Sequence, residues 1–201
     1  MYFPVCIVEK AHGRNQVRLQ SAFVPYYLPI PHELRRFAVC VVVETATAYY
    51  LGSGTVTEKG IITAKHLFPE LGVMDARIYL YSSMYTTTIV PVRGVYFEVD
   101  RDIALLEASV PQFIRPCSIK QLSNINPRRL VAFGCPNACY GVSWRPCIVS
   151  YNDDFVVTQD VVIPGVSGGG IIYNYNDKWH VIAVHSFGYL REKTLYSVRV
   201  A

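Results

Sequence analysis

Residues 52–68 read GSGTVTEKGIITAKHLF. A run of small and β-branched residues is followed by the polar turn EKG and then by the apolar run IITA, which ends just ahead of His66. β-Branched residues on both sides of a short polar turn are typical of a β-hairpin. The stretch therefore predicts a hairpin that leads to the strand IITA and then to a histidine at the start of a short turn.

Short apolar segments recur along the rest of the chain, and helical periodicity is almost absent. They are rich in Val, Ile, Tyr and Phe and cover residues 37–43, 77–81, 94–99, 103–108, 128–134, 170–175, 180–187 and 194–200. Many short strands at this spacing indicate an all-β barrel or sandwich. We expect an N-terminal extension or connector over 1–36, a first β-barrel over 37–112 and a second over 113–201. Residues 1–10 could add a strand to the first barrel or be a removable leader.

Length, composition and charge set the broad class of the protein. The 201 residues are 51% hydrophobic, which suits a large buried core and excludes a disordered tail. No apolar run reaches the roughly 18 residues of a membrane helix, and the first ten residues lack a signal-peptide pattern. We therefore expect a cytoplasmic protein without membrane contact. A net charge of +4 with no long basic run does not indicate nucleic-acid binding.

Six cysteines raise the question of a metal or a disulfide. In an unsecreted protein, buried reduced thiols are the first expectation. Cys135, Cys139 and Cys147 could bind zinc together with Cys117 or a histidine, but their spacing is not a standard zinc pattern. One disulfide is favoured over a metal, and neither a metal nor a cofactor is predicted.

The stretch PGVSGGG, residues 164–170, surrounds one serine with four glycines and a proline. A serine hydroxyl becomes a useful nucleophile when a base takes its proton and donors await the developing oxyanion. Glycines allow a tight turn that presents the hydroxyl, and they leave backbone amides such as those of Gly165 and Ser167 uncovered. A glycine-rich hairpin turn is the alternative interpretation.

Asp102 supplies the third group, at the mouth of the apolar strand in DRDIALLEA, residues 100–108. A carboxylate beside buried leucines needs a partner, and an imidazole N–H is a good one. Each residue alone has a structural explanation, with His66 as a strand-end histidine and Asp102 as a turn residue. The order His, Asp, Ser, each in a β context, favours a catalytic triad.

The blocks GSGTVTEKGIITAKH, DIALL and PGVSGGG together resemble trypsin-fold (chymotrypsin-like, PA clan) serine endopeptidases. VIAVHSFG (181–188) resembles the strand that lines the substrate cleft in that family, and TLYSVRV (194–200) resembles its closing strand. The likeness thus spans about residues 37–201. It implies an all-β fold of two antiparallel six-stranded barrels, with the active site in the cleft between them.

The resemblance also implies a role for each motif residue. His66 would be the general base, Asp102 its orienting partner and Ser167 the nucleophile that forms an acyl-enzyme. The amides of Gly165 and Ser167 would form the oxyanion hole, and the hydroxyl of Ser186 would support Asp102. A polypeptide is then the expected partner, acted on by a monomer or a weak homo-oligomer.

Departures from the secreted branch of the family point to its compact viral and bacterial members. Val166 replaces the aspartate that pairs with a newly cut N-terminus in secreted enzymes, and Leu67 replaces a disulfide cysteine. The chain is more similar to glutamyl endopeptidases and viral main proteases, and a viral enzyme would act in the host cytoplasm or the virion. The alternatives are a non-catalytic trypsin-fold binding module and a capsid or processing protein that cleaves only itself.

The resemblance also identifies residues expected to contact substrate. A histidine at the place of His185 binds a Glu or Gln side chain in some relatives, which suggests Glu or Gln at P1, the residue that supplies the scissile carbonyl. An apolar pocket, and a buried histidine bonded to backbone, are the alternatives. The predicted substrate-binding residues are His185, Ser186, Phe187, Gly188, Val161, Val162 and Thr194.

The sequence VRLQSAF, residues 17–23, resembles main-protease cleavage junctions, because Leu-Gln precedes a small residue. We predict self-processing between Gln20 and Ser21, since an exposed chain ahead of the proline-rich connector could enter a cleft. The intact mass of the wild type should then fall on incubation, while that of a Ser167→Ala variant stays constant. Equal, unchanged masses after long incubation would contradict the prediction.

Overall fold

The computed structural model is built almost entirely of β-strands. It describes residues 1–11, 14–18, 28–29, 37–69, 72–81, 87–111, 118–119, 125–136, 141–160 and 164–200. Within these ranges the only helices are two short 3₁₀ turns, η1 (Lys65–Leu67) and η2 (Pro127–Arg129). No helix in the described ranges is long and apolar enough to cross a membrane.

The first sheet contains the hairpin predicted from residues 52–68. Its nine strands are all antiparallel and run in the order β8-β7-β4-β5-β6-β10-β9, with β1 on β5 and β2 on β1. They are β1 (Cys6–Ala11), β2 (Arg14–Arg18), β4 (Ala38–Thr45), β5 (Ala48–Thr57), β6 (Gly60–Thr63), β7 (Val73–Tyr81), β8 (Thr87–Pro91), β9 (Gly94–Phe97) and β10 (Ala104–Glu107). The residues ahead of the first predicted barrel thus contribute a strand, β1, that pairs with β5.

The second sheet holds the C-terminal half of the chain and also has nine strands. Its order is β14-β15-β18-β17-β16-β12-β13-β3, with the short β11 parallel to β17. Its strands are β3 (Leu28–Pro29), β11 (Ser118–Ile119), β12 (Leu130–Gly134), β13 (Val142–Trp144), β14 (Ile148–Tyr151), β15 (Phe155–Thr158), β16 (Gly170–Tyr175), β17 (Lys178–Tyr189) and β18 (Thr194–Arg199).

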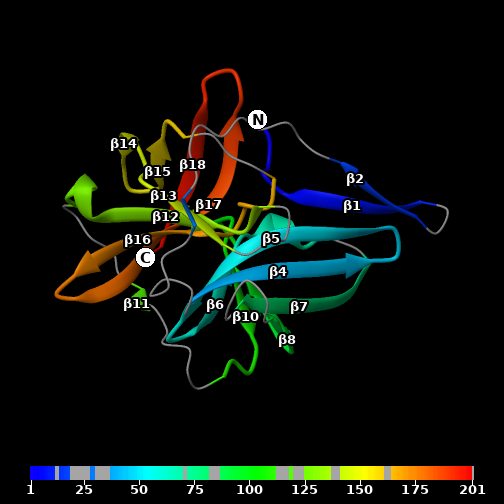
Figure 1. The fold of residues 1–201 in the computed structure, drawn as a ribbon. Coiled ribbons are helices and arrows are strands. Elements are labelled where there is room, and N and C mark those ends of the chain that lie inside the picture. Colours follow the sequence, from blue (N-terminus) through cyan, green and yellow to red (C-terminus); the bar gives the residue numbers. More distant parts are fainter. Residues whose placement is uncertain are drawn as a thin grey trace.

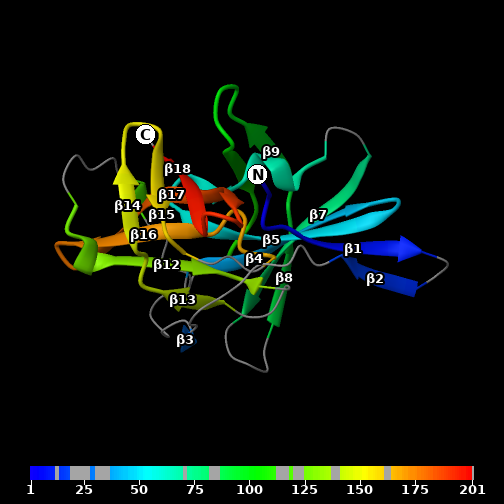
Figure 2. The same cartoon turned by 90° about the horizontal axis from the view of Figure 1, so that it is seen from above.

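Both sheets curl into half-barrels that lie side by side (Figures 1 and 2). This confirms the predicted all-β fold of two barrels. Among the described residues each sheet has nine strands instead of six, partly because β1 and β3, from the expected connector, pair with strands of the barrels and β2 pairs with β1. The chain's N-terminal residues lie where the two halves meet (Figure 2).

One apolar core joins the two halves. It contains the fully or almost fully buried Ile61 and Leu106 of the first sheet together with Phe133, Val181 and Val184 of the second. Close packing of this kind resists deformation, because side chains have few alternative places to go. The shared core therefore fixes the positions of the two halves relative to one another.

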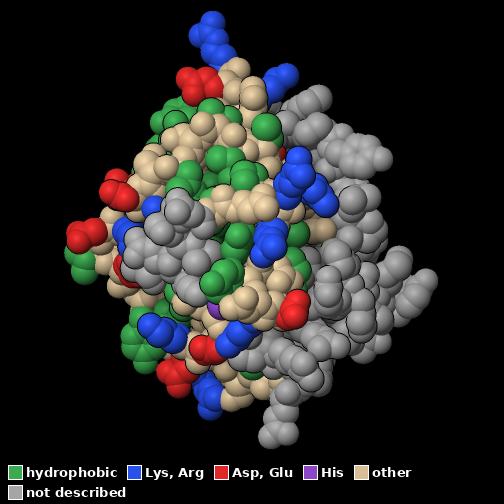
Figure 3. All heavy atoms as spheres, turned by 90° about the vertical axis from the view of Figure 1, so that its left-hand side faces the viewer, with side chains coloured by type: hydrophobic (Ala, Val, Ile, Leu, Met, Phe, Trp, Pro, Cys, Tyr) green, Lys and Arg blue, Asp and Glu red, His purple; other side chains and the backbone are tan. Residues whose placement is uncertain are grey.

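The surface carries charges of both signs. On the face shown in Figure 3, Lys and Arg side chains lie among Asp and Glu side chains and do not gather into one patch. That face therefore presents no extended field of a single sign.

Candidate active site

His66 and Asp102 meet because β6 and β10 are antiparallel neighbours. Thr63, at the end of β6, pairs with Ala104, at the start of β10, so the residues that follow β6 lie beside those that precede β10. The turn η1 begins there and carries His66. The His66 backbone N–H donates to Asp102 Oδ1 at 2.9 Å, and His66 Nδ1 lies 2.6 Å from Asp102 Oδ2. The carboxylate thus holds both the main chain and the ring of the histidine.

Ser167 comes from the second half and reaches the other side of the same ring. Its Oγ lies 2.8 Å from His66 Nε2. With the proton on Nδ1, the ring donates to Asp102 and its Nε2 accepts from the serine hydroxyl. The structure therefore brings the three predicted triad residues together in the order Asp, His, Ser.

The loop that carries Ser167 depends on glycine at two positions. Gly165 and Gly168 have φ values of +107° and +88°, where residues with a side chain are strained. A Cβ on Gly168 would also lie 2.2 Å from the Ser53 carbonyl oxygen and from Thr63 Oγ1. The glycines allow the loop to turn sharply while it lies against the first sheet.

Asp102 is held in its ionised form. Burial raises the pKa of this carboxyl, but hydrogen bonds and charge from His66, with a hydrogen bond from Ser186, outweigh burial and lower it overall. Ser186 Oγ donates to Asp102 Oδ2 at 2.5 Å, which is the contact expected from the resemblance. An ionised Asp102 can stabilise a positive charge on the His66 ring.

Two backbone amides beside Ser167 converge on one point. The N–H groups of Gly165 and Ser167 donate to the same oxygen, the carbonyl of Pro4, at 2.8 and 3.0 Å. This is the arrangement needed to stabilise an oxyanion, since both donors are fixed before any charge develops. The oxygen that the two amides bind here belongs to the chain's own N-terminal segment.

Ser53 fixes this loop and was missed by the sequence analysis. Its Oγ donates to the Gly165 carbonyl at 2.6 Å and accepts from the Cys135 amide at 2.7 Å, and its N–H donates to the Ser167 carbonyl at 2.8 Å. Ser53 lies on β5, so the contacts join the loop that carries Ser167 to the first sheet. The available signal was a lone hydroxyl between two glycines in GSG, at the start of the quoted hairpin.

His185 is fully buried, and its own chain occupies both ring nitrogens. Nε2 donates to the Phe133 carbonyl at 3.1 Å, and Nδ1 lies 2.9 Å from Ser197 Oγ, with the Trp144 ring stacked at 5.4 Å. Burial lowers the pKa of His185 to about 3, so the ring is neutral. This geometry matches the alternative of a buried histidine bonded to backbone, and a substrate contact would require one of these bonds to open.

The other predicted substrate-binding residues lie in different places. Phe187 stacks on Tyr196 at 4.8 Å and lines a cavity of about 560 Å³ beside His66 and Asp102. Gly188 exchanges two backbone hydrogen bonds with Tyr2, and Thr194 pairs with Tyr189 in the hairpin that follows. Val161 and Val162 lie outside the described residues.

Asp160 is a buried carboxyl in the second half of the fold. Burial raises its pKa, and the polar groups of Thr158 and Trp144, with the Cys147 amide at 3.4 Å from Oδ1, offset that effect only in part. Asp160 therefore differs from Asp102, whose partners lower its pKa. A buried carboxyl with a raised pKa loses its proton at a higher pH in the folded chain than in the unfolded chain.

Of the described cysteines, Cys40 and Cys135 lie in the same buried cluster. Cys6, Cys40 and Cys135 are buried and Cys147 is exposed, while Cys117 and Cys139 lie outside the described residues. Within the part of the chain that the structure describes, no group of three or more His, Cys, Asp and Glu residues is placed to hold a metal ion.

Comparison with known proteins supports the fold. No protein-family model matches the chain, and no curated protein matches it. Among solved structures it is similar to the protease Anisep from Arthrobacter nicotinovorans, with a TM-score of 0.61 and 14% sequence identity. The match covers 82% of this chain and 90% of the other. The two curled antiparallel sheets are thus the halves of a chymotrypsin-like fold, one that a known protease also has.

A Ser53→Ala variant tests how the loop is held. It would leave the buried Gly165 carbonyl and Cys135 amide without a partner, so we expect a loss of about 1–3 kcal/mol in the free energy of unfolding. Urea unfolding measures this loss. Ser150→Ala, on an exposed part of β14, is the matched control and should be neutral. An unchanged free energy of unfolding for Ser53→Ala would show that the loop does not depend on this hydroxyl.

The raised pKa of Asp160 predicts a pH dependence of stability. Protonated Asp160 contributes fully to the free energy of unfolding below the ordinary Asp pKa of about 3.9. This contribution is lost as pH rises through the raised pKa of the folded chain, because the carboxyl ionises more readily in the unfolded chain. Asp160→Asn cannot ionise, so its stability should fall less than that of the wild type as pH rises from about 4 to 8. Urea unfolding at several pH values compares them, with exposed Asp177→Asn as control. Parallel curves for wild type and Asp160→Asn would refute the assignment.

Proposed function

We propose that this protein is a serine endopeptidase that hydrolyses peptide bonds through an acyl-enzyme on Ser167. One observation carries the proposal. His66 lies 2.6 Å from Asp102 and 2.8 Å from Ser167, while two amides beside Ser167 already bind a peptide carbonyl oxygen. Base, nucleophile and oxyanion donors are therefore present in one place, on a fold that a known protease shares.

The geometry supports the usual order of events in acylation. His66 Nε2 takes the proton of Ser167 as Oγ forms a bond to the carbonyl carbon of the substrate. The carbonyl oxygen becomes negative and is stabilised by the amides of Gly165 and Ser167. The protonated ring, stabilised by Asp102, then gives its proton to the leaving nitrogen as the C–N bond breaks. Water, activated by the same ring, releases the acyl group in the second half of the reaction.

The finer predictions stand as part of this proposal. Cleavage after Gln20 concerns residues outside the described ranges. A preference for Glu or Gln at P1 draws no support from His185, since both its nitrogens are bonded within the chain. A viral origin rests on the departures at Val166 and Leu67 and on the likeness of residues 17–23 to main-protease cleavage junctions.

Triad variants distinguish an enzyme from a binding module. A fluorophosphonate probe should label the wild type at Ser167, and Ser167→Ala should not react. In Asp102→Asn the amide would donate to His66 and favour the wrong ring tautomer, which should lower kcat by about 10⁴-fold. Peptide hydrolysis and labelling measure both effects.

Asp177→Asn, in an exposed turn, is the control and should keep wild-type activity. Absence of labelling in correctly folded wild type and in every cleft variant described below would favour a non-catalytic trypsin-fold module.

A further inference from the structure

The chain's own residues 1–5 lie in the groove beside the triad. Tyr2 and Gly188 exchange two backbone hydrogen bonds of 2.9 Å in an antiparallel bridge. The ring of Phe3 packs on His66 with centroids 4.4 Å apart. The Pro4 carbonyl oxygen accepts from Gly165 and Ser167. Three consecutive residues thus contact three different parts of the candidate site.

These contacts have the register of a bound substrate. A peptide that acylates Ser167 must place its scissile carbonyl between the oxyanion donors, and Pro4 does so. An extended peptide commonly adds to an exposed strand edge, and Tyr2 does so on β17. Pro4 therefore occupies the position of P1, Phe3 that of P2 and Tyr2 that of P3.

The fit between this segment and the groove is close. Pro4 and Val5 are buried, and burial raises the pKa of the Tyr2 hydroxyl to about 12. A Cβ on Gly188 would lie 2.9 Å from the Tyr2 ring and 2.7 Å from the Thr194 carbonyl oxygen. The bare backbone of Gly188 is what allows the Tyr2 ring to lie against β17.

Two features make the segment a poor substrate despite its register. Pro4 has no N–H to donate to the cleft, unlike other residues at P1. The Val5 N–H donates to the Phe3 carbonyl at 2.8 Å, so the chain turns back at the bond that would be cut. The Val5 nitrogen, which would be the leaving group, therefore points back towards Phe3, and the chain does not continue in an extended conformation across the groove.

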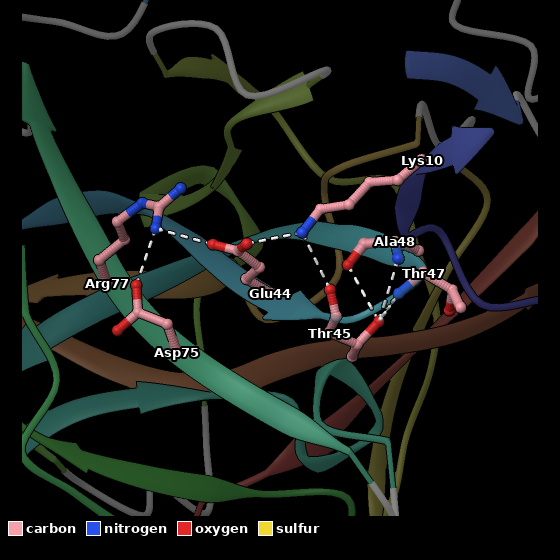
Figure 4. A network of polar contacts seen from close by, with 7 residues as sticks. All are labelled: Lys10, Glu44, Thr45, Thr47, Ala48, Asp75 and Arg77. Carbon is pink, nitrogen blue, oxygen red and sulfur yellow. Dashed lines mark hydrogen bonds and ion pairs between the residues drawn. The ribbon is translucent and has the colours of Figure 1, made fainter. Parts of the chain in front are cut away.

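The chain beyond Val5 is anchored to the first sheet. β1 pairs with β5 from Cys6 to Glu9, and Lys10 Nζ lies 2.6 Å from Glu44 and 3.1 Å from the Thr45 carbonyl oxygen. Glu44 also contacts Arg77 at 3.3 Å, as Figure 4 shows. An anchor this close keeps the segment at a high effective concentration, because its binding is intramolecular.

We propose that residues 1–5 form an intramolecular inhibitor that mimics a substrate and competes with peptides for the groove. This inference rests on the proposed protease function. The groove accepts an extended peptide with bulky residues at P2 and P3, and its present occupant must withdraw before another peptide can bind.

Two variants that weaken the segment test the proposal. Tyr2→Pro removes the N–H that donates to Gly188, and Phe3→Ala removes the ring on His66. If the segment fills the groove about nine-tenths of the time, kcat/KM for a peptide should rise about tenfold, through KM and with kcat unchanged. Fluorophosphonate labelling of Ser167 should accelerate in parallel. Ile89→Ala, exposed on β8, is the control and should match the wild type.

Adding the segment back provides a second test. A capped synthetic peptide Met-Tyr-Phe-Pro-Val should inhibit the Tyr2→Pro variant competitively, and a scrambled peptide should not. Restored inhibition by the added peptide cannot arise from altered folding of the variant. No inhibition at millimolar peptide would overturn the proposal, since that is the range of a short tether.

The outcomes separate this proposal from the function on which it rests. Equal hydrolysis and labelling by wild type, Tyr2→Pro and Phe3→Ala would overturn the inhibitor while the protease stands. No reaction of the probe with any of the three would overturn both. Loss of residues 1–4 from the wild type, absent in Ser167→Ala, would make the segment a substrate and also overturn the inhibitor.

Discussion

The candidate site depends on how Ser53 binds the loop that carries Ser167. Through its amide and hydroxyl, Ser53 bonds the carbonyls of Ser167 and Gly165, and its hydroxyl also accepts from the Cys135 amide. These bonds join β5 to two separate segments of the second half. These groups are buried, so breaking one bond would leave a polar atom with neither a protein partner nor water. The free-energy cost of such a loss makes the arrangement rigid. Ser167 therefore meets His66 at a distance set by the hydrogen bonds of Ser53 to the backbone of the second half.

Asp102, which is partly buried, and Asp160, which is buried, show how surroundings decide the state of a carboxyl. Asp102 receives hydrogen bonds from the His66 backbone, the His66 ring and Ser186, and together they lower its pKa despite burial. Asp160 has weaker support, including a Cys147 amide at 3.4 Å, so burial raises its pKa. Donors from three directions thus favour a negative charge on Asp102 beside the His66 ring, whereas burial with weaker support disfavours ionisation of Asp160.

Local patterns in the sequence predicted ten of the strands, β4–β7, β9, β10, β12 and β16–β18, and singled out His66, Asp102 and Ser167, whereas β8 and β13–β15 were not predicted. Each of these residues lies next to an apolar strand or among glycines, and such signals are short-range. Ser53 was missed because its role depends on Gly165, 112 positions away, and no local pattern reports that contact. His185 was given a substrate role from resemblance, while its bonding to Phe133 and Ser197 depends on packing across the second half. Pairing of β1 with β5 was foreseen only as one of two options.

Residues 1–5 lie where the backbone groups of both halves need partners. A strand edge at Gly188 exposes an N–H and a C=O that require partners, and the amides of Gly165 and Ser167 require an acceptor. Water or a peptide can satisfy all of them, and Tyr2 and Pro4 do so here. A substrate would replace these bonds with equivalent ones, so the exchange is nearly balanced in hydrogen-bond energy. Residues 1–5 are favoured because β1 and Lys10 tether them next to the groove, which raises their effective concentration. A competing peptide has no such tether, so its side chains must make more favourable contacts with the groove.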